Sequence, residues 1–203
     1  LGAEVEKGLV AGIRRYREEI LQAAAPRIFE DLMRMFRGGA MAPAFDMMLA
    51  YGVLEVLIPE LYELLREETR EGNQDEVEAL RAMLRTADRW AQQGRELAAC
   101  TQLALLLSPV LMRAIEEKNV RDAGAAINDT LKPIAQRVSI SRKDSERMRQ
   151  VLLAQSRMMP HRKGRRRFSV SAFLGRAYFP DALDLFELMT ESTGDLRDRA
   201  AKW

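Results

Sequence analysis

Residues 96–107 have the sequence ELAACTQLALLL, in which nine of the twelve side chains are apolar. A helix with this sequence is apolar around most of its circumference, so we expect it at the centre of the hydrophobic core. Ser108 and Pro109 follow, and a proline inside a helix removes a backbone hydrogen bond. We therefore expect one helix over residues 96–107 and a separate helix from Pro109 to about residue 118. Cys100, the only cysteine, is expected to be a small core residue.

The segments on either side of this stretch have apolar residues at helical spacing, and none alternates with period two long enough to predict a strand. An apolar link is expected at 53–58, before a helix that begins at Pro59. Ser141 and Asp144 resemble a capping box at the start of a helix. The other helices are expected at residues 5–24, 27–37, 41–51, 75–93, 123–138 (with a bend or break before Pro133), 142–158 and 179–194. The sequence thus predicts an all-α fold, an irregular array of about 9–11 helices without a sheet.

The charge distribution is uneven. Residues 147–180 contain no Asp or Glu but nine Lys or Arg, so the rest of this +2 chain has a net charge of −7. Clustered positive charge beside an acidic body attracts polyanions. The densest part, residues 161–168 (HRKGRRRF), is typical of a nucleic-acid patch. A solvated loop that keeps the protein soluble is the alternative.

Several function classes find no support. A single histidine and a single cysteine cannot form a zinc site, and the sequence contains no phosphate-binding loop and no nucleophile elbow. We predict no catalytic residues and no metal ligands in this chain. No uninterrupted apolar run approaches the roughly 20 residues of a membrane span, and no signal peptide opens the chain, so no membrane partner is expected. One unpaired cysteine favours the reducing cytoplasm.

Two groups of motifs carry a family resemblance. Residues 27–32 (RIFEDL), 38–39 (GG) and 51–61 (YGVLEVLIPEL) together resemble the bacterial poly(A) polymerase and CCA-adding tRNA nucleotidyltransferase superfamily. A second group more closely resembles the poly(A) polymerase branch: residues 126–129 (AIND), 139–142 (SISR), 162–168 (RKGRRRF) and 179–186 (FPDALDLF).

The resemblance implies that the chain is the helical body and tail of such an enzyme. In that family the catalytic parts, including an Asp-x-Asp pair that binds magnesium, lie in an N-terminal head, and none of them occurs in these 203 residues. Phosphoryl transfer needs metal-binding carboxylates and a phosphate cradle. The chain is therefore expected to need no cofactor and to be inactive alone, whereas the full enzyme would use ATP and Mg²⁺. The opening residues resemble the part just beyond the family's neck, so we expect a fragment.

The resemblance also implies the partners and the organisation. The expected partners are an RNA 3′ end, mRNA-like or tRNA, and the N-terminal catalytic head of the same enzyme. A polar break at residues 71–73 predicts a neck-proximal helical subdomain, residues 1–72, and a body and tail subdomain, residues 73–203, with the basic segment facing RNA. The predicted RNA-binding residues are Arg142, Lys143, Arg162, Lys163, Arg165, Arg166, Arg167 and Phe168.

We expect the cations to contact backbone phosphates and Phe168 to stack on a base or to anchor the core. The function expected is RNA binding within a poly(A) polymerase, which adds AMP to RNA 3′ ends. Two alternatives stay open. One is the same region of a CCA-adding tRNA nucleotidyltransferase. The other is a non-catalytic helical interaction module that docks through the methionine-rich residues 33–48.

Overall fold

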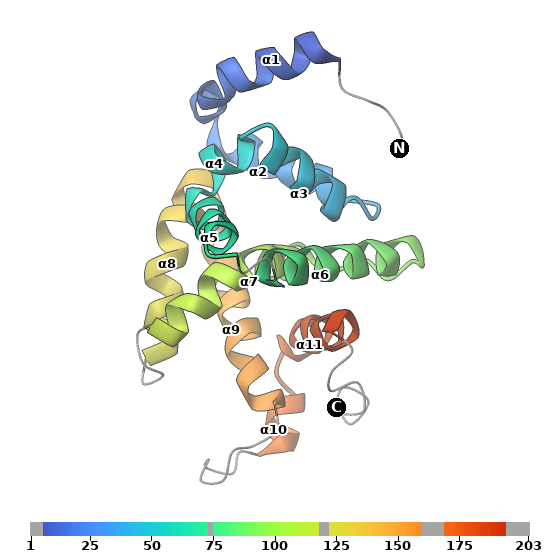
Figure 1. Cartoon of the computed structure of the whole chain (residues 1–203). Helices are drawn as coiled ribbons and strands as arrows, with labels where there is room; N and C mark the ends of the chain where they lie inside the picture. The colour runs from blue at the N-terminus through green and yellow to red at the C-terminus, as the bar shows by residue number, and fades with distance from the viewer. Residues whose placement is uncertain (1–5, 73–74, 118–121, 160–168, 194–203) are drawn as a thin grey trace.

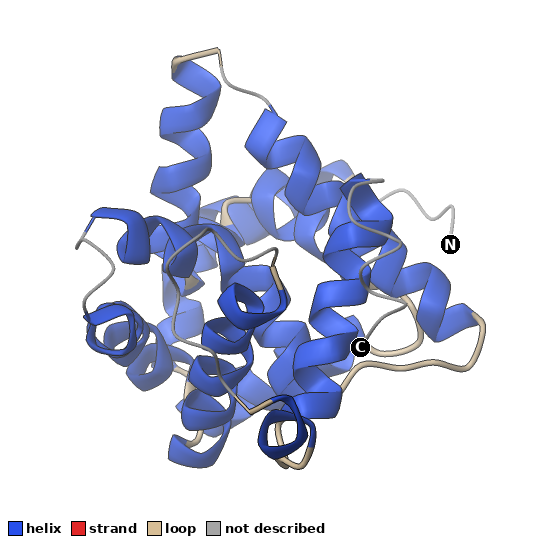
Figure 2. Cartoon of the chain, turned by 90° about the horizontal axis from the view of Figure 1, so that it is seen from below, coloured by secondary structure: helices blue, strands red, loops and turns tan. Residues whose placement is uncertain are grey.

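The computed structural model describes residues 6–72, 75–117, 122–159 and 169–193 (Figure 1). Of the described residues, 84% are helical, and no strand occurs among them (Figure 2). Eleven α-helices and one 3-10 helix lie in these ranges. The all-α prediction is therefore confirmed.

The first predicted helix, residues 5–24, is wrong as a single element. It consists of α1, Lys7–Tyr16, and a 3-10 helix, η1, Arg17–Gln22. No side chain described between residues 6 and 22 is buried, so core packing does not enforce one continuous α-helix. The guanidinium of Arg17 instead pairs with Glu55 at 3.0 Å, which fixes η1 against the next helices. In Figure 1, α1 lies at the edge of the molecule, away from the central helices.

Five helices follow in close succession. The predicted apolar link at residues 53–58 is itself mostly helical, because Leu54 and Leu57 bury one face of a short helix that starts after Gly52 in a left-handed conformation (φ 75°). The helices are α2 (Ala25–Phe36), α3 (Met41–Ala50), α4 (Val53–Leu57), α5 (Pro59–Arg70) and α6 (Asp75–Gln92).

The central helix is α7, Ala99–Glu117, and it packs against α5, α6, α8, α9 and α11. The predicted break at Pro109 is wrong, since α7 is continuous through this residue. Pro109 cannot donate to the carbonyl of Leu105, but the Ser108 hydroxyl donates to that oxygen at 2.8 Å. The buried carbonyl thus keeps a partner and the helix continues. Cys100 is buried, as predicted.

The next two helices pack against each other and are joined by a short turn. Helix α8, Ala123–Val138, is not broken at Pro133, which lies on its exposed face, where the carbonyl left without a backbone donor is open to solvent. Ser139 ends α8 in a left-handed conformation (φ 59°). Helix α9, Arg142–Met158, then begins with Ser141 as its N-cap, whose hydroxyl accepts a hydrogen bond from the Asp144 N–H at 3.0 Å. The predicted cap is confirmed.

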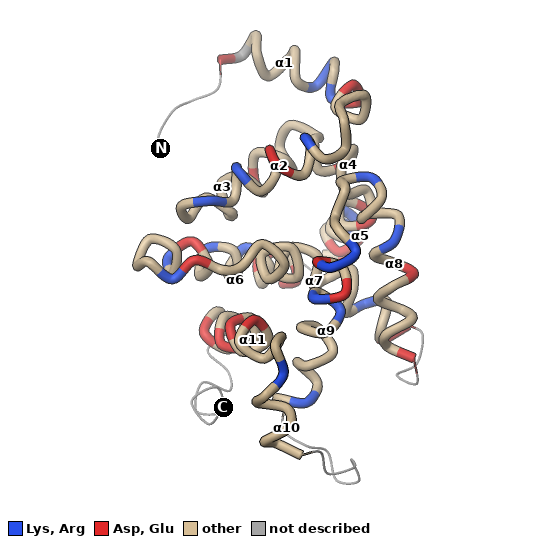
Figure 3. The backbone as a smooth tube through the Cα atoms, turned by 180° about the vertical axis from the view of Figure 1, so that it is seen from behind, with Lys and Arg blue, Asp and Glu red and all other residues tan. Residues whose placement is uncertain are grey.

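The C-terminal part adds α10, Val170–Leu174, and α11, Phe179–Thr193. Helix α10 was not predicted, since its five residues are too few to show a period. Helix α11 packs against α6, α7 and α9. The acidic positions of α11, red in Figure 3, pair with arginines of other segments. Arg95, for example, pairs with both Asp184 and Glu187, at 2.5 and 2.6 Å.

The main apolar core runs from Ile28 in α2 to Leu188 in α11 and so includes residues from both predicted subdomains. The boundary at residue 72 stays a prediction. A side chain pair also ties the early helices to α8: Arg137 donates to both carboxylate oxygens of Glu60, at 2.9 and 3.0 Å, and to the Leu57 carbonyl. This clamp sets the position of α8 relative to α4 and α5.

Within the described residues, one helix, α7, has the length and composition of a membrane span, although the sequence analysis expected none. Counting an uninterrupted apolar run missed it, because single polar residues such as Gln102 and Ser108 divide the helix. Of the relevant window, 61% is buried inside the protein. A core helix has the same composition, and the packing of α7 on five other helices is that of a core helix.

Candidate nucleic-acid interface

The densest predicted RNA contacts lie outside the described residues. These are Arg162, Lys163, Arg165, Arg166, Arg167 and Phe168. Their assignment to RNA stays a prediction.

The described residues on either side of that segment are held by a second apolar cluster. Met158 ends α9 and is fully buried, and Phe173 in α10 is 2% exposed in the same cluster. The Phe173 ring meets that of Phe179 edge to face, with centroids 5.3 Å apart. Residues 158 and 173 are therefore anchored at one place, between α9, α10 and α11.

Part of the acid-free run is neutralised in the fold. Arg147 pairs with Asp181 at 2.6 Å, and Arg149 pairs with Glu146 at 2.6 Å. Both acids lie just beyond the ends of the run, and folding brings them onto its first arginines. Counting charges along the sequence therefore overstates the positive charge that this region offers to an external anion. Arg157 packs over the Phe173 ring, 5.7 Å from its centroid.

Arg142 and Lys143 are the predicted RNA contacts that the structure does describe. They occupy the first turn of α9, directly after the Ser141 cap, and both side chains are exposed. Within the described ranges neither has an ion pair or a hydrogen bond through its side chain. Cations at a helix N-terminus gain nothing from the helix dipole, so an external anion is the natural partner for these two.

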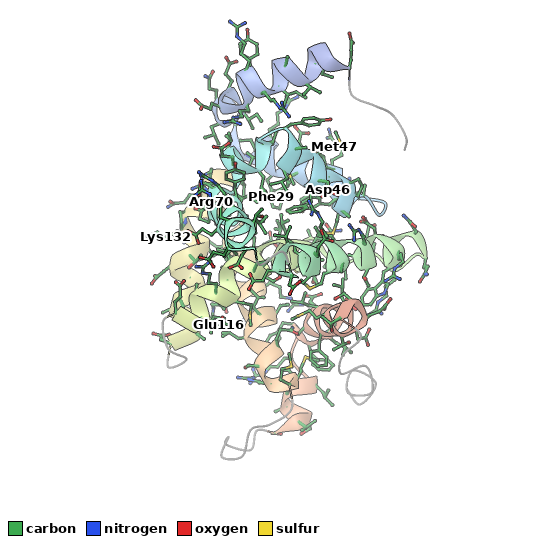
Figure 4. The ribbon with its side chains drawn as sticks, in the orientation of Figure 1. Phe29, Asp46, Met47, Arg70, Glu116 and Lys132 are labelled. Carbon is green, nitrogen blue, oxygen red and sulfur yellow. The ribbon has the colours of Figure 1, made fainter. Side chains whose placement is uncertain are left out.

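Arg142 lines a surface hollow of about 430 Å³ between α8 and α9. Helix α8 contributes Lys132, an exposed cation that is labelled in Figure 4 and also lacks an internal side-chain partner in the described part of the chain. The remaining lining residues are Asn128, Leu131, Ala135, Gln136, Ile140, Ser145 and Glu146. We call this the α8–α9 hollow. It brings together two free cations that are ten positions apart in sequence.

The sequence analysis missed Lys132. The available signal was the recurrence of polar residues at positions 128, 132 and 136, which places all three on one face of a helix. The charge argument overlooked this face because Lys132 lies outside the acid-free run.

Glu146 is the one acid that lines the α8–α9 hollow. A hydrogen bond from Arg149, helped by a second from Gln150, lowers the pKa of this carboxyl below its usual range, despite an opposing desolvation effect. Glu146 is therefore ionised but paired, and the free charge around the hollow is that of Lys132 and Arg142.

A second hollow, of about 400 Å³, lies between α5 and α6 and is lined by three arginines, Arg66, Arg70 and Arg81. We call it the α5–α6 hollow. Arg81 donates to Asp46 at 2.9 Å and to Glu78 at 2.8 Å, and Arg66 pairs with Glu63 at 3.2 Å. Asp46, labelled in Figure 4, lies on α3. Two of the three guanidinium groups are thus already engaged by carboxylates of the protein.

A third hollow, between α5, α7 and α8, is acidic. It is lined by Glu60, Glu63, Glu67 and Glu117 together with Arg113. This surface would repel a phosphodiester chain. Among the described residues no three His, Cys, Asp or Glu side chains lie close enough to hold a metal ion.

Comparison with known proteins identifies the region. A family model described as "Probable RNA and SrmB- binding site of polymerase A" matches residues 2–65. Another, "Polymerase A arginine-rich C-terminus", matches residues 116–203 and includes both the α8–α9 hollow and the basic segment. No curated protein matches the chain significantly. The two matches follow each other in order and cover about three quarters of the sequence. The chain belongs to the polymerase A family, as its RNA-binding and arginine-rich C-terminal region.

Proposed function

We propose that this chain holds the 3′-terminal part of an RNA primer for a poly(A) polymerase, while an N-terminal catalytic head adds AMP. RNA is the partner that the family matches support. The observation that carries the proposal is the match of residues 116–203 to the arginine-rich C-terminus, together with the free cations Arg142 and Lys143 in this region.

The contacts proposed are electrostatic. Arg142, Lys143 and the arginines and lysine of the segment 162–167 bind successive phosphates, whereas Phe168 stacks on a base. With these seven phosphate contacts, the logarithm of affinity for single-stranded RNA falls with the logarithm of salt concentration at a slope of roughly −5. Such binding depends little on sequence, as suits a primer-holding surface.

ATP and Mg²⁺ are proposed to be bound by the head. The described residues of this chain do not gather the carboxylates that a catalytic metal needs. The exposed apolar side chains Leu9, Tyr16 and Leu21 on α1 and η1 suit contact with the head. A cytoplasmic location fits a chain with one cysteine and remains part of the proposal.

The test is binding of oligo(A) and of an unmodified tRNA by the purified chain, at 50 and 200 mM salt. We expect comparable, salt-sensitive binding of both RNAs. A marked preference for tRNA would favour the CCA-adding alternative. An absence of salt-sensitive binding to either RNA would favour the other alternative, a non-catalytic helical interaction module.

The triple variant R165A/R166A/R167A tests the basic segment. Loss of three phosphate contacts should make the salt slope shallower by about 2. Circular dichroism checks that the variant keeps its helix content, so that a loss of binding is not a loss of folding. R85A is a matched control, since Arg85 is exposed and lies outside both family matches. Unchanged RNA binding by the triple variant would show that the segment is not the interface.

A further inference from the structure

We infer that one single-stranded RNA runs along the exposed face of α9, from the α8–α9 hollow to the end of the helix beside α10. The inference rests on the proposed RNA-binding function and adds the route of the strand and the shortest RNA that binds tightly. The route consists of five cations, which we call the α9 track: Lys132, Arg142, Arg149, Arg157 and Arg176.

The exposed side of α9 carries three arginines in a row. Arg142, Arg149 and Arg157 follow one another at intervals of seven and eight residues. With 3.6 residues per turn, these intervals place the three positions within a sector of about 80° around the helix. The opposite side of α9 is buried in the core, where it presents Met148, Val151, Leu152, Ala154 and Met158. A strand that follows α9 therefore meets the arginines one after another over about 22 Å.

Arg149 is the middle of the α9 track and keeps free donors despite its ion pair. Its Nε and Nη2 groups donate to the two carboxylate oxygens of Glu146, at 2.8 and 2.6 Å. Because a guanidinium has further N–H donors, this bidentate pair leaves Nη1 available. Nη1 lies against Gly124 of α8, where a Cβ would be only 3.1 Å away. The glycine lets α8 approach Arg149 without covering it, and the arginine side chain is 27% exposed.

The end of the α9 track beside α10 keeps its positive charge. Arg157 packs over the Phe173 ring and donates to the Tyr178 hydroxyl at 3.5 Å. These neutral partners hold the guanidinium in place, and no carboxylate pairs with it in the described residues. Arg176 lies two residues before Tyr178, is exposed, and has no side-chain partner in the same ranges. In Figure 1, α9 leads down to α10, so unneutralised cations lie at both ends of this helix.

The surface on the other side of α8 repels RNA and so favours this route. Thr130 of α8 lines the acidic hollow between α5, α7 and α8, whereas Lys132 lines the α8–α9 hollow. Helix α8 thus separates an acidic surface from a basic one. A phosphodiester chain bound at Lys132 is repelled by the glutamates of the acidic hollow and attracted by the arginines of α9.

The length of the α9 track sets a length requirement for RNA. A stacked strand advances about 3.4 Å per nucleotide, so about seven nucleotides span the distance from Arg142 to Arg157. A tetranucleotide contacts only one end of the track. A longer strand that holds one end makes binding at the other end intramolecular, which raises the affinity without any new kind of contact.

The experiment measures fluorescence anisotropy of labelled oligo(A) of 4, 8 and 12 nucleotides with the whole chain at 0.1 M salt. The 12-mer should bind about a hundredfold more tightly than the 4-mer. At saturation, one 12-mer should be bound per chain. Two 12-mers per chain would show that the two ends bind separate strands, which overturns the α9 track.

A carboxylate placed in the middle of the track tests the route. Gln150 lies on the same face of α9, between Arg149 and Arg157, and donates to Glu146 at 2.8 Å. Q150E should weaken binding of the 12-mer about fivefold, because the new charge repels the strand at close range. Binding of the 4-mer should change by less than about twofold, since both ends lie about a Debye length away. Q93E is the matched control, because Gln93 is an exposed glutamine beside the end of α6. It should alter neither affinity.

The two ends of the track are tested by removing their cations. K132A/R142A should reduce the ratio of 12-mer to 4-mer affinity from about a hundredfold to about tenfold, because the longer strand then holds one end only. R157Q/R176Q should make the salt slope of 12-mer binding shallower by about 1.4. Circular dichroism checks that each variant keeps its helix content. An unchanged ratio in the first variant, or an unchanged slope in the second, overturns the assignment of that end.

The outcomes separate this inference from the proposed function. Salt-sensitive RNA binding in which Q150E does not weaken the 12-mer overturns the α9 track and leaves the primer-holding function intact. Absence of salt-sensitive RNA binding overturns both.

Discussion

The α5–α6 hollow and the α8–α9 hollow are similar in size, about 400 and 430 Å³, and both are lined by basic side chains. They differ in what those side chains already bind. Arg66 and Arg81 pair with acids of the protein, which leaves Arg70 as the one cation of the α5–α6 hollow without a side-chain partner in the described ranges. In the α8–α9 hollow, both Lys132 and Arg142 are without one in those ranges. A count of lysines and arginines cannot distinguish the two surfaces. Free rather than total charge is the property that marks an anion site.

The largest expected effect comes from reversing the free charges. K132E/R142E should weaken oligo(A) binding about thirtyfold at 0.1 M salt, because two attractions of roughly 1 kcal/mol each become repulsions that salt partly screens. The matched change in the other hollow, R66A/R81A, should alter the affinity by less than about twofold. Filter binding measures both. Equal losses from the two pairs would remove the distinction between the hollows.

Arg137 lies on the same helix as Lys132, but its replacement should lower the stability of the fold, whereas replacement of Lys132 should not. R137A breaks the two hydrogen bonds to Glu60 and the bond to the Leu57 carbonyl, and should lower the free energy of unfolding by about 1–2 kcal/mol for this half-buried pair. Urea denaturation followed by circular dichroism measures the loss. K132A should leave the unfolding midpoint unchanged. A destabilised K132A would mean that Lys132 also has a structural role.

Removing the acids that pair with Arg81 should give the α5–α6 hollow an additional free cation and so make it more like the α8–α9 hollow. D46N/E78Q removes both charged partners of Arg81. One additional phosphate contact should make the salt slope steeper by about 0.7 and raise RNA affinity about threefold. Salt titration of oligo(A) binding tests this. An unchanged slope would indicate that the shape of the α5–α6 hollow, and not its internal ion pairs, keeps RNA away.

The smallest expected effect concerns the acid at the edge of the α8–α9 hollow. E146Q removes a negative charge and releases Arg149, so oligo(A) affinity should rise about twofold. The same pair predicts a pH effect on stability. Because the Arg149 hydrogen bond lowers the folded-state pKa of Glu146, the pair stabilises the fold above the ordinary pKa of a glutamate. This stabilisation is lost as the pH falls through the lowered pKa.

Acid titration of unfolding free energy, compared between the wild-type chain and E146Q, isolates this contribution. The difference between the two proteins should shrink toward acidic pH. A difference that grows on acidification would contradict the assigned direction of the pKa shift.

Local sequence patterns predicted helix starts correctly where no residue nearby favoured a different structure. The Ser141 cap and the start of α11 near Phe179 both follow from residues a few positions apart. The breaks expected at the two prolines are absent, because the cost of a proline inside a helix depends on the neighbouring groups. Pro109 is accommodated by the Ser108 hydroxyl, and Pro133 by its exposed position. These circumstances arise only once the helix is placed in the fold.

The sequence by itself determined the all-α class, the order of most helices and the resemblance to polymerase A, since these depend on short-range periodicity and on motifs read in order. The tertiary structure alone decided which cations remain free. Asp181 reaches Arg147 from 34 positions away, Asp46 reaches Arg81 from 35, and Lys132 lines the same hollow as Arg142. Ion pairs form between residues that are close in space, and packing of helices sets that proximity.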